Sequence, residues 1–296
     1  MIISQMILLF GLMAVGYLAK ITKIMDNISD KYFSKFITNI AIPATILSSA
    51  IGQNIGDKMS TFKVLLVAIS IFLATPFISI LIVKILKLER TYELMLNYSN
   101  LGFMGIPIIS SIYGNKYVLY VSIFMMVFNI SLFSHGVSIL QKENNSSKVQ
   151  LKNLLNPGII SALATLLIFI FEIPMNEFIT IILKNIGSIT TPLAMIIIGS
   201  ILASVKITSI FTDKKIYIYT ILKILVYPLL TWIILHNFVN DPVIIGVTVI
   251  LCGLPTAGNV SMLCSDYNGN VELVTKGMFL STIFSFVTIP LLMLIF

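Results

Sequence analysis

Charged residues are scarce in this sequence: they make up 10% of its 296 residues, whereas 57% are hydrophobic. Soluble domains carry about a quarter charged residues, and here the shortage extends over nearly the whole chain. With a mean hydropathy of +1.02, so much apolar surface cannot be hidden in one water-soluble core. The composition therefore excludes a soluble catalytic domain and indicates an integral membrane protein.

Cysteines and catalytic motifs are scarce as well. The two cysteines, Cys252 and Cys264, are roughly 18 Å apart if their stretch is helical, at about 1.5 Å per residue, which is too far for a disulfide. The sequence has no HExxH motif, no Walker-type glycine loop and no paired carboxylates within an apolar stretch. We therefore expect no enzyme, no catalytic residues, no metal site and no resident cofactor. The formal charge of +7 comes from basic residues that stand singly between apolar runs, so no nucleic-acid partner is expected.

Long apolar runs are what the chain does contain. A helix needs about 20 residues to cross the hydrocarbon core of a membrane, and cutting the sequence at its charged residues leaves ten windows of about that length. Only the eighth window contains a formal charge, Lys223. The ten windows are 1–19, 36–56, 64–83, 94–115, 117–141, 153–171, 185–205, 216–240, 242–265 and 277–296. We predict an all-α membrane protein with ten spans.

The basic residues predict how the spans are oriented. Most lysines and arginines fall in one set of alternate loops, while the other set holds only Lys58, Lys63, Lys116 and Lys184. Because basic loops are retained in the cytoplasm, both termini are expected outside the cell membrane and the polar connection 141–152 inside. Residues 1–19 carry no charge, so we interpret them as the first span and not as a secretory signal.

The prolines indicate an internal repeat. Pro43 and Pro192 lie near the middle of the second and seventh windows, while Pro107 and Pro255 lie in the fourth and ninth. The separations agree, because 107 − 43 is 64 and 255 − 192 is 63. Repeats with five spans each must enter the membrane from opposite sides, which is typical of transporters. We therefore predict two inverted five-helix repeats, residues 1–140 and 153–296, joined by the linker 141–152. Pro43 and Pro192 are expected to mark helix breaks or hinges.

The fourth and ninth windows mix Gly, Pro, Asn, Ser and Thr at mid-membrane depth, in the segments NYSNLGFMGIPIISSIYG and LCGLPTAGNVSMLCSDY. Such stretches break helices, and the backbone groups that they free are tolerated only where protein or a water-filled cavity meets them. Two crossing broken helices would direct their partial positive ends at one solute site. Ordinary kinks and close helix packing are the alternative. The candidate substrate-binding residues are Asn100 and Asn259 first, then Ser99, Gly102, Pro107, Gly253, Pro255, Thr256 and Gly258.

Three motifs carry a family resemblance: NxGFxGIPIxxxxYG over residues 100–114, GLPTAGN over 253–259 and STIFSFVTIP over 281–290. Together they resemble the auxin efflux carrier family, including its bacterial malate-permease-like members, over essentially the whole chain. The resemblance implies two crossing broken helices, a scaffold made of spans one, two, six and seven, a mobile transport domain and carboxylate substrates. Plant members have a Pro-Asn pair at the first crossover, whereas this chain has Ser99-Asn100, so Pro107 or residues 102–105 are an alternative unwinding point.

Ionisable residues within the windows are few. Glu93 and Asp266 lie at window edges, so we do not expect a proton relay through a buried carboxylate. Lys223 lies about 10 Å into the eighth window, and the favoured interpretation is that it snorkels to the cytoplasmic interface. The alternative is a role in substrate binding or ion coupling. His135 is expected to be an interfacial polar residue and not a proton carrier.

These features predict a secondary transporter that moves a small organic anion, a malate-like or auxin-like carboxylate, across the cell membrane by alternating access. The alternatives are a sodium- or proton-coupled exchanger of related inverted-repeat fold, or a membrane receptor that does not transport. The expected partners are the anion and membrane lipid, with coupling to Na⁺ or H⁺ and assembly as a homodimer left open.

Overall fold

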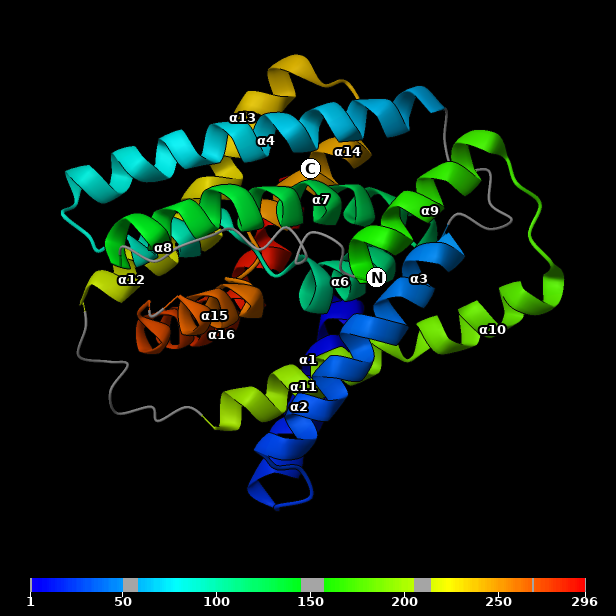
Figure 1. The fold of residues 1–296 in the computed structure, drawn as a ribbon, viewed down its shortest axis with the longest axis horizontal. Helices are drawn as coiled ribbons and strands as arrows, with labels where there is room; N and C mark the ends of the chain where they lie inside the picture. The colour runs from blue at the N-terminus through cyan, green and yellow to red at the C-terminus, as the bar shows by residue number, and fades with distance from the viewer. Residues whose placement is uncertain (1, 50–57, 145–156, 205–213, 268, 296) are drawn as a thin grey trace. The chain divides into compact units, whose positions relative to one another are not determined.

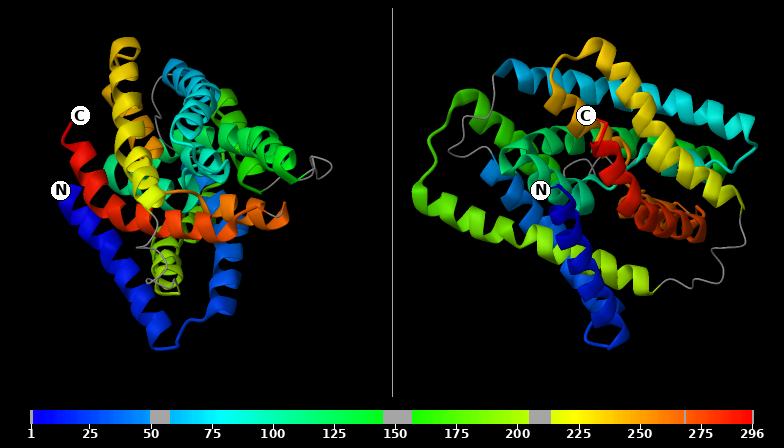
Figure 2. Two further views of the ribbon diagram at one scale, coloured as in Figure 1. Left: turned by 90° about the vertical axis from the view of Figure 1, so that its left-hand side faces the viewer. Right: turned by 180° about the vertical axis from the view of Figure 1, so that it is seen from behind.

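The computed structural model describes residues 2–49, 58–144, 157–204, 214–267 and 269–295 (Figures 1 and 2). Within these residues every regular element is helical, which confirms the predicted all-α class. Most of the predicted linker 141–152 lies outside the described residues.

Five of the predicted windows form helices that are long and apolar enough to cross a membrane, counting only the described parts of the chain. These helices span Lys58–Ile85, Asn115–Leu140, Glu177–Ala203, Lys214–Phe238 and Val271–Met293. Shorter apolar helices occupy Ile7–Ile21, Leu101–Tyr113, Pro157–Phe171 and Pro242–Cys252. The chain is therefore a protein with several membrane-spanning helices.

The helices gather into two compact units, each built from several stretches of the chain. Unit 1 comprises Met1–Leu65, Leu101–Met126 and Leu154–Ser204. It therefore gathers the first, second, sixth and seventh windows together with residues 101–126 of the fourth and fifth. The scaffold that the family resemblance implies consists of spans one, two, six and seven, and stays a prediction. Its elements are α1 (Ile2–Ile21), α2 (Asn27–Phe36), α3 (Ile42–Ser49), the start of α4 (Lys58–Ile85), α6 (Ile106–Tyr113), most of α7 (Val118–Ser131), α9 (Pro157–Phe171), α10 (Glu177–Ser188) and α11 (Thr190–Ala203).

Close contact between α1 and α11 is the main packing feature of unit 1 (Figure 1). A Cβ added at Gly16 would collide with the carbonyl oxygen of Ile196, and one added at Gly199 would collide with the carbonyl oxygen of Met13. Only glycine at both positions lets the two backbones approach this closely.

Several polar groups inside unit 1 are paired with one another. Asp30 accepts hydrogen bonds from the Lys20 ammonium at 2.5 Å and from the Ser200 hydroxyl at 2.6 Å. Thr45 lies at hydrogen-bond distance from the Gly187 carbonyl, at 3.0 Å, and from the Thr190 hydroxyl, at 2.7 Å. These pairs join helices far apart in the sequence and satisfy polar atoms that would otherwise be costly to bury.

Outside the spans, α2 begins with a reciprocal cap. The Asp26 carboxylate accepts a hydrogen bond from the backbone N–H of Ser29, and the Ser29 hydroxyl accepts one from the backbone N–H of Asp26. The accepted backbone hydrogen bond is the main reason why the pKa of Asp26 lies below its ordinary value.

Unit 2 comprises Leu66–Asn100, Val127–Asn153 and Val205–Phe296. Its helices α12 and α13 form one continuous bent rod (Figure 2). Gly277 of α16 lies so close to Met95 and Tyr219 that a larger residue would displace them. The elements of this unit are the rest of α4, α5 (Thr91–Asn97), the end of α7, α8 (Val137–Asn144), α12 (Lys214–Ile221), α13 (Tyr227–Phe238), α14 (Pro242–Cys252), α15 (Gly258–Asp266) and α16 (Val271–Met293).

In the described parts of the chain, four turns of π-helix interrupt the α-helices, at Ile37–Ala41, Leu101–Gly105, Leu132–Gly136 and Leu222–Val226. The first, second and fourth are each followed, after one residue, by a proline: Pro43, Pro107 and Pro228. Proline has no N–H and its ring clashes with the carbonyl four residues earlier, so the preceding turn widens. Pro192 likewise lies two residues into α11, just after the interruption at Ile189 that separates this helix from α10. The predicted helix irregularities at Pro43 and Pro192 are therefore present, and their role as hinges stays a prediction.

Candidate functional site

Two helix breaks of unit 2 pair with each other. α5 ends at Asn97 and α14 ends at Cys252, and the chain is not helical at residues 98–100 and 253–257. The N–H of Asn100 donates to the Pro255 carbonyl at 2.8 Å, and the N–H of Ala257 donates to the Tyr98 carbonyl at 2.9 Å. Residues 99 and 256 thus face each other in an antiparallel bridge. Each break supplies the backbone partners that the other has lost, as burial in a membrane requires.

Thr256 connects this bridge to the neighbouring helices. Its hydroxyl donates to the Met95 carbonyl at 3.0 Å and is also hydrogen-bonded to the Tyr219 hydroxyl. Met95 is in the last turn of α5, where carbonyl groups lack partners within the helix. The second break therefore caps the helix that precedes the first.

A buried lysine completes the site. Lys223, in the π-helical turn Leu222–Val226, is 1% exposed. Its ammonium donates to the Leu96 carbonyl at 2.6 Å and to the Ser99 hydroxyl at 2.8 Å. Among the residues that the structure describes, no carboxylate forms an ion pair with it. The expectation that Lys223 snorkels to the interface is wrong, because the end of α5 holds its ammonium inside the unit.

The position of this cation has an electrostatic reason. The last carbonyls of α5 carry partial negative charge, and an ammonium against the Leu96 carbonyl is the matching charge. Two of the three donors of the ammonium are accounted for by these bonds. The arrangement places a buried lysine side chain beside the paired breaks.

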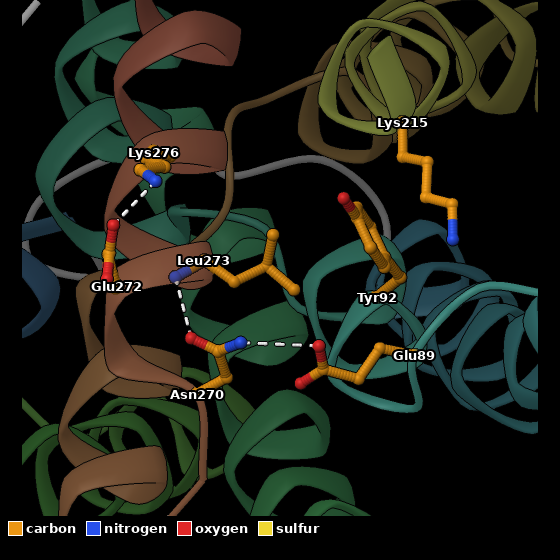
Figure 3. A pocket seen from close by; sticks show the side chains of 7 residues that line it. All are labelled: Glu89, Tyr92, Lys215, Asn270, Glu272, Leu273 and Lys276. Carbon is orange, nitrogen blue, oxygen red and sulfur yellow. Dashed lines mark hydrogen bonds and ion pairs between the residues drawn. The ribbon is translucent and has the colours of Figure 1, made fainter. Parts of the chain in front are cut away.

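A polar cavity of about 300 Å³ lies near the start of α16 (Figure 3). Tyr92 lines it, and the ring of Tyr92 packs against Tyr219 with 5.8 Å between centroids. Tyr219 in turn contacts Thr256 of the second break. The Asn270 amide bridges to Glu89 at 3.2 Å, and Lys276 pairs with Glu272 at 2.6 Å. Two tyrosine rings therefore separate this charged cavity from the paired breaks.

Glu93 and His135 lie beside each other. The Glu93 side chain is 8% exposed and its Oε1 lies 3.3 Å from Nε2 of His135. Nδ1 of His135 lies 3.1 Å from the hydroxyl of Tyr98. Glu93 is thus a buried carboxylate in a hydrogen-bonded chain, although it lies at the edge of its window. The His135 side chain is 27% exposed, and its interfacial role stays a prediction.

Several predicted site residues come together as expected from the sequence. Ser99, Asn100, Pro255 and Thr256 lie in or beside the antiparallel bridge. The chain is non-helical at residues 98–100, whereas the alternative stretch, residues 102–105, lies in the π-helical turn Leu101–Gly105 that precedes Pro107. Helix breaking falls on the Ser99-Asn100 pair even without the proline of plant members.

The remaining candidates of unit 2 lie at the two ends of the second break. Gly258 and Asn259 are exposed at the start of α15. A Cβ on Gly253 would lie 3.1 Å from Leu292 and from Pro228, whereas one on Gly258 would meet nothing within 4 Å. Gly253 is therefore closely packed and Gly258 is not.

Gly102 and Pro107 belong to unit 1. A Cβ on Gly102 would approach the side chain of Ile42 at 3.2 Å, and Pro107 is buried in the first turn of α6. Within this unit both act in packing.

Sequence analysis missed Tyr98 and Tyr219, which hold the two breaks in place. Tyr98 precedes the Ser99-Asn100 pair directly, and its burial follows from that position. The sequence around Tyr219 does not indicate this role. Tyr219 is connected to the site only through its position four residues before Lys223, a helical spacing that places both side chains on one face.

The helices and the site define a polytopic membrane protein with paired helix breaks around a buried cation, a combination typical of transporters. Residues 1–293 match the family described as membrane transport protein. The chain therefore belongs to this auxin efflux carrier-like family of membrane transporters.

Curated relatives cover nearly all of the chain. An uncharacterized transporter of Methanocaldococcus jannaschii is 26% identical over 95% of this chain and 94% of its own length. A second uncharacterized transporter, from Methanothermobacter thermautotrophicus, is 21% identical over 95% of this chain and 93% of its own. The lysosomal cholesterol signaling protein of Mus musculus is 22% identical over 96% of this chain, which spans only 36% of the mouse protein.

Proposed function

We propose that the protein is a secondary transporter that carries a small organic anion, a malate-like or auxin-like carboxylate, across the cell membrane by alternating access. The observation that carries the proposal is Lys223, a buried cation beside the paired breaks with no carboxylate in an ion pair among the described residues. A buried charge without a counter-charge is costly, and a bound carboxylate would neutralise it.

Neighbouring groups support a carboxylate at this place. The side chain of Asn100 is half-buried directly after Ser99. α15 begins at Gly258 with no side-chain cap, and helix N-termini favour anions. A carboxylate can accept hydrogen bonds from the Asn100 amide and from the backbone N–H groups at the start of α15.

The proposal includes an arrangement of ten spans as two inverted repeats, residues 1–140 and 153–296. It also includes a location in the cell membrane with both termini outside. Unit 1, which gathers spans one, two, six and seven together with residues 101–126, would be the scaffold, and unit 2, which holds both breaks and Lys223, would carry the anion.

Flux into liposomes tests the proposal directly. Purified protein reconstituted in liposomes should take up radiolabelled malate or indole acetate faster than protein-free liposomes, and excess unlabelled substrate should compete. A panel of carboxylates run with and without sodium would identify the substrate class. Uptake no faster than in empty liposomes for every carboxylate of the panel would contradict the proposal.

A signalling receptor is the second candidate, because the mouse relative is named as a cholesterol signaling protein. In that case a sterol would bind to the purified chain and no carboxylate flux would be measured. The liposome assay therefore separates the two functions.

Orientation is tested by cysteine labelling. With both termini outside, an impermeant thiol reagent on intact cells should modify a cysteine added after Phe296 and should leave a cysteine at Ser147 unmodified. The native Cys252 and Cys264 are buried and provide the background signal. The opposite labelling pattern would show that the orientation is reversed.

Asn100→Ala and Asn259→Ala are expected to impair anion binding more than folding. A lost hydrogen bond to a buried ligand is worth on the order of 1 to 3 kcal/mol, or roughly tenfold to a hundredfold in affinity. Asn129→Ala is the matched control, because Asn129 is a buried asparagine of α7 outside the breaks. Affinity and melting temperature are measured for all three variants. Equal, mild effects at the three positions would indicate generic helix packing instead.

A further inference from the structure

A second cavity in unit 2, of about 450 Å³, is lined by three basic residues. Lys84 is in the last turn of α4, and Lys87 and Arg90 follow in the connection to α5. All three are exposed. None of them forms an ion pair with a carboxylate among the residues that the structure describes. The cavity therefore presents three cationic side chains without a paired acid.

The end of α4 brings these side chains to one place. The N–H of Lys87 donates to the Lys84 carbonyl at 3.3 Å, and the N–H of Leu88 donates to the Val83 carbonyl at 2.9 Å. These two bonds close a turn that folds the connection back against the last turn of the helix. The basic residues are thus positioned by backbone hydrogen bonds and not only by side-chain flexibility.

Two carboxylates near the basic residues are engaged elsewhere. Glu89 accepts hydrogen bonds from the Thr91 hydroxyl at 2.8 Å and from the Asn270 amide at 3.2 Å, and it lines the other cavity (Figure 3). Glu93 lines the present cavity, but its Oε1 lies 3.3 Å from Nε2 of His135. The lining therefore carries three formal positive charges against one negative charge, which favours an anionic ligand.

The apolar part of the lining indicates what else the ligand contains. α4 and the helix Asn115–Leu140 are both long and apolar enough to cross a membrane, and the cavity is lined by Lys84 and Ile139, close to the end of each. Lipid headgroups lie at the ends of spanning helices, and acyl chains lie beside their apolar length. Ile80 and Val83 line the cavity one turn before its basic residues. Basic and apolar walls thus follow each other as a headgroup and its chains do.

We propose that this cavity binds the phosphate headgroup of an anionic membrane phospholipid. The Arg90 guanidinium can hold two phosphate oxygens at once, and Lys84 and Lys87 add two ammonium groups. Basic pockets between spanning helices on the cytoplasmic side are typical sites for such headgroups, and the distribution of basic loops predicts that side for this connection. A free phosphate ion offers the same oxygens but no chain for the apolar wall. The inference goes beyond the proposed function and does not depend on it.

Lipid binding to the purified full chain in detergent tests the inference. Dioctanoyl phosphatidylglycerol should bind and raise the melting temperature. Phosphatidylcholine of the same chain length should bind more weakly, because its choline cancels the phosphate charge. The variant Lys84→Gln/Lys87→Gln/Arg90→Gln should bind phosphatidylglycerol roughly a hundredfold more weakly, since each basic residue near a headgroup contributes about fivefold.

A second triple variant is the matched control. Lys23→Gln/Lys31→Gln/Lys35→Gln removes the same charge from exposed residues in the same set of alternate loops. It should bind phosphatidylglycerol like wild type. Equal losses of affinity in the two triple variants would show a general attraction to basic surface and would overturn the inference.

Protection of an added cysteine gives a measurement that does not require the triple variant to fold. Phosphatidylglycerol should slow the reaction of Lys84→Cys with a thiol reagent, whereas Lys31→Cys should react at an unchanged rate. The native Cys252 and Cys264 are buried and provide the background. No protection by phosphatidylglycerol overturns the inference, and so does equal protection by phosphatidylcholine. Equal protection by inorganic phosphate at the same concentration would assign the cavity to a free anion and overturn the lipid. No transported solute is present, so none of these outcomes bears on the proposed function.

Discussion

Lys223→Met is expected to lower anion affinity by roughly a hundredfold, or about 3 kcal/mol, because a hydrogen bond between two charged groups at a buried site is lost. Folding should be affected far less. The variant loses donors to the Leu96 carbonyl and the Ser99 hydroxyl, but it also removes a buried charge with a large desolvation cost. Calorimetric titration with malate or indole acetate and a thermal unfolding scan measure the two effects separately.

Lys223→Gln distinguishes binding from a purely structural role. Glutamine retains an N–H donor for the Leu96 carbonyl but carries no charge. If the lysine only caps α5, this variant should bind anion like wild type. If the charge holds the anion, affinity should stay as low as in the methionine variant. Lys214→Met, at an exposed lysine at the start of α12, is the matched control and should change neither measurement.

Much of the fold could be predicted from local sequence. The apolar windows locate the long helices because a membrane-spanning helix must be apolar along its whole length. The proline positions locate the interruptions because a missing N–H acts within one turn. The Ser99-Asn100 and GLPTAGN segments likewise predict the two breaks, because the residues that disfavour a helix lie within the breaks themselves.

The wrong expectations all concern depth and partners. The distance of Lys223 from the end of its window predicts a position at the interface. Its ammonium instead donates to the Leu96 carbonyl at the end of α5, 127 positions earlier in the chain. The sequence places Glu93 at the edge of a window. In the structure Glu93 is buried inside unit 2, because it belongs to the short helix α5 and its carboxylate faces His135. Single-sequence patterns describe where a residue is along a helix and carry no information on which helix end or side chain lies opposite.

Gly16→Ala and Gly199→Ala are expected to destabilise the protein by roughly 3 kcal/mol each, or about 6 to 12 °C in melting temperature. The added methyl groups would collide with backbone atoms, the carbonyl oxygens of Ile196 and Met13. Backbone cannot rotate away as a side chain can, so α1 and α11 must separate. Thermal unfolding of the two variants in detergent measures the effect.

Gly11→Ala in the same helix is the control. Nothing lies within 4 Å of a Cβ at Gly11, so this variant should be neutral or slightly stabilised by the better helix propensity of alanine. The double variant Gly16→Ala/Gly199→Ala should lose less stability than the sum of the two single changes. The two contacts lie one turn apart along the same helix pair, so one separation of α1 from α11 relieves both collisions. Additive losses, or a destabilised Gly11→Ala, would show that the helices do not depend on this close approach.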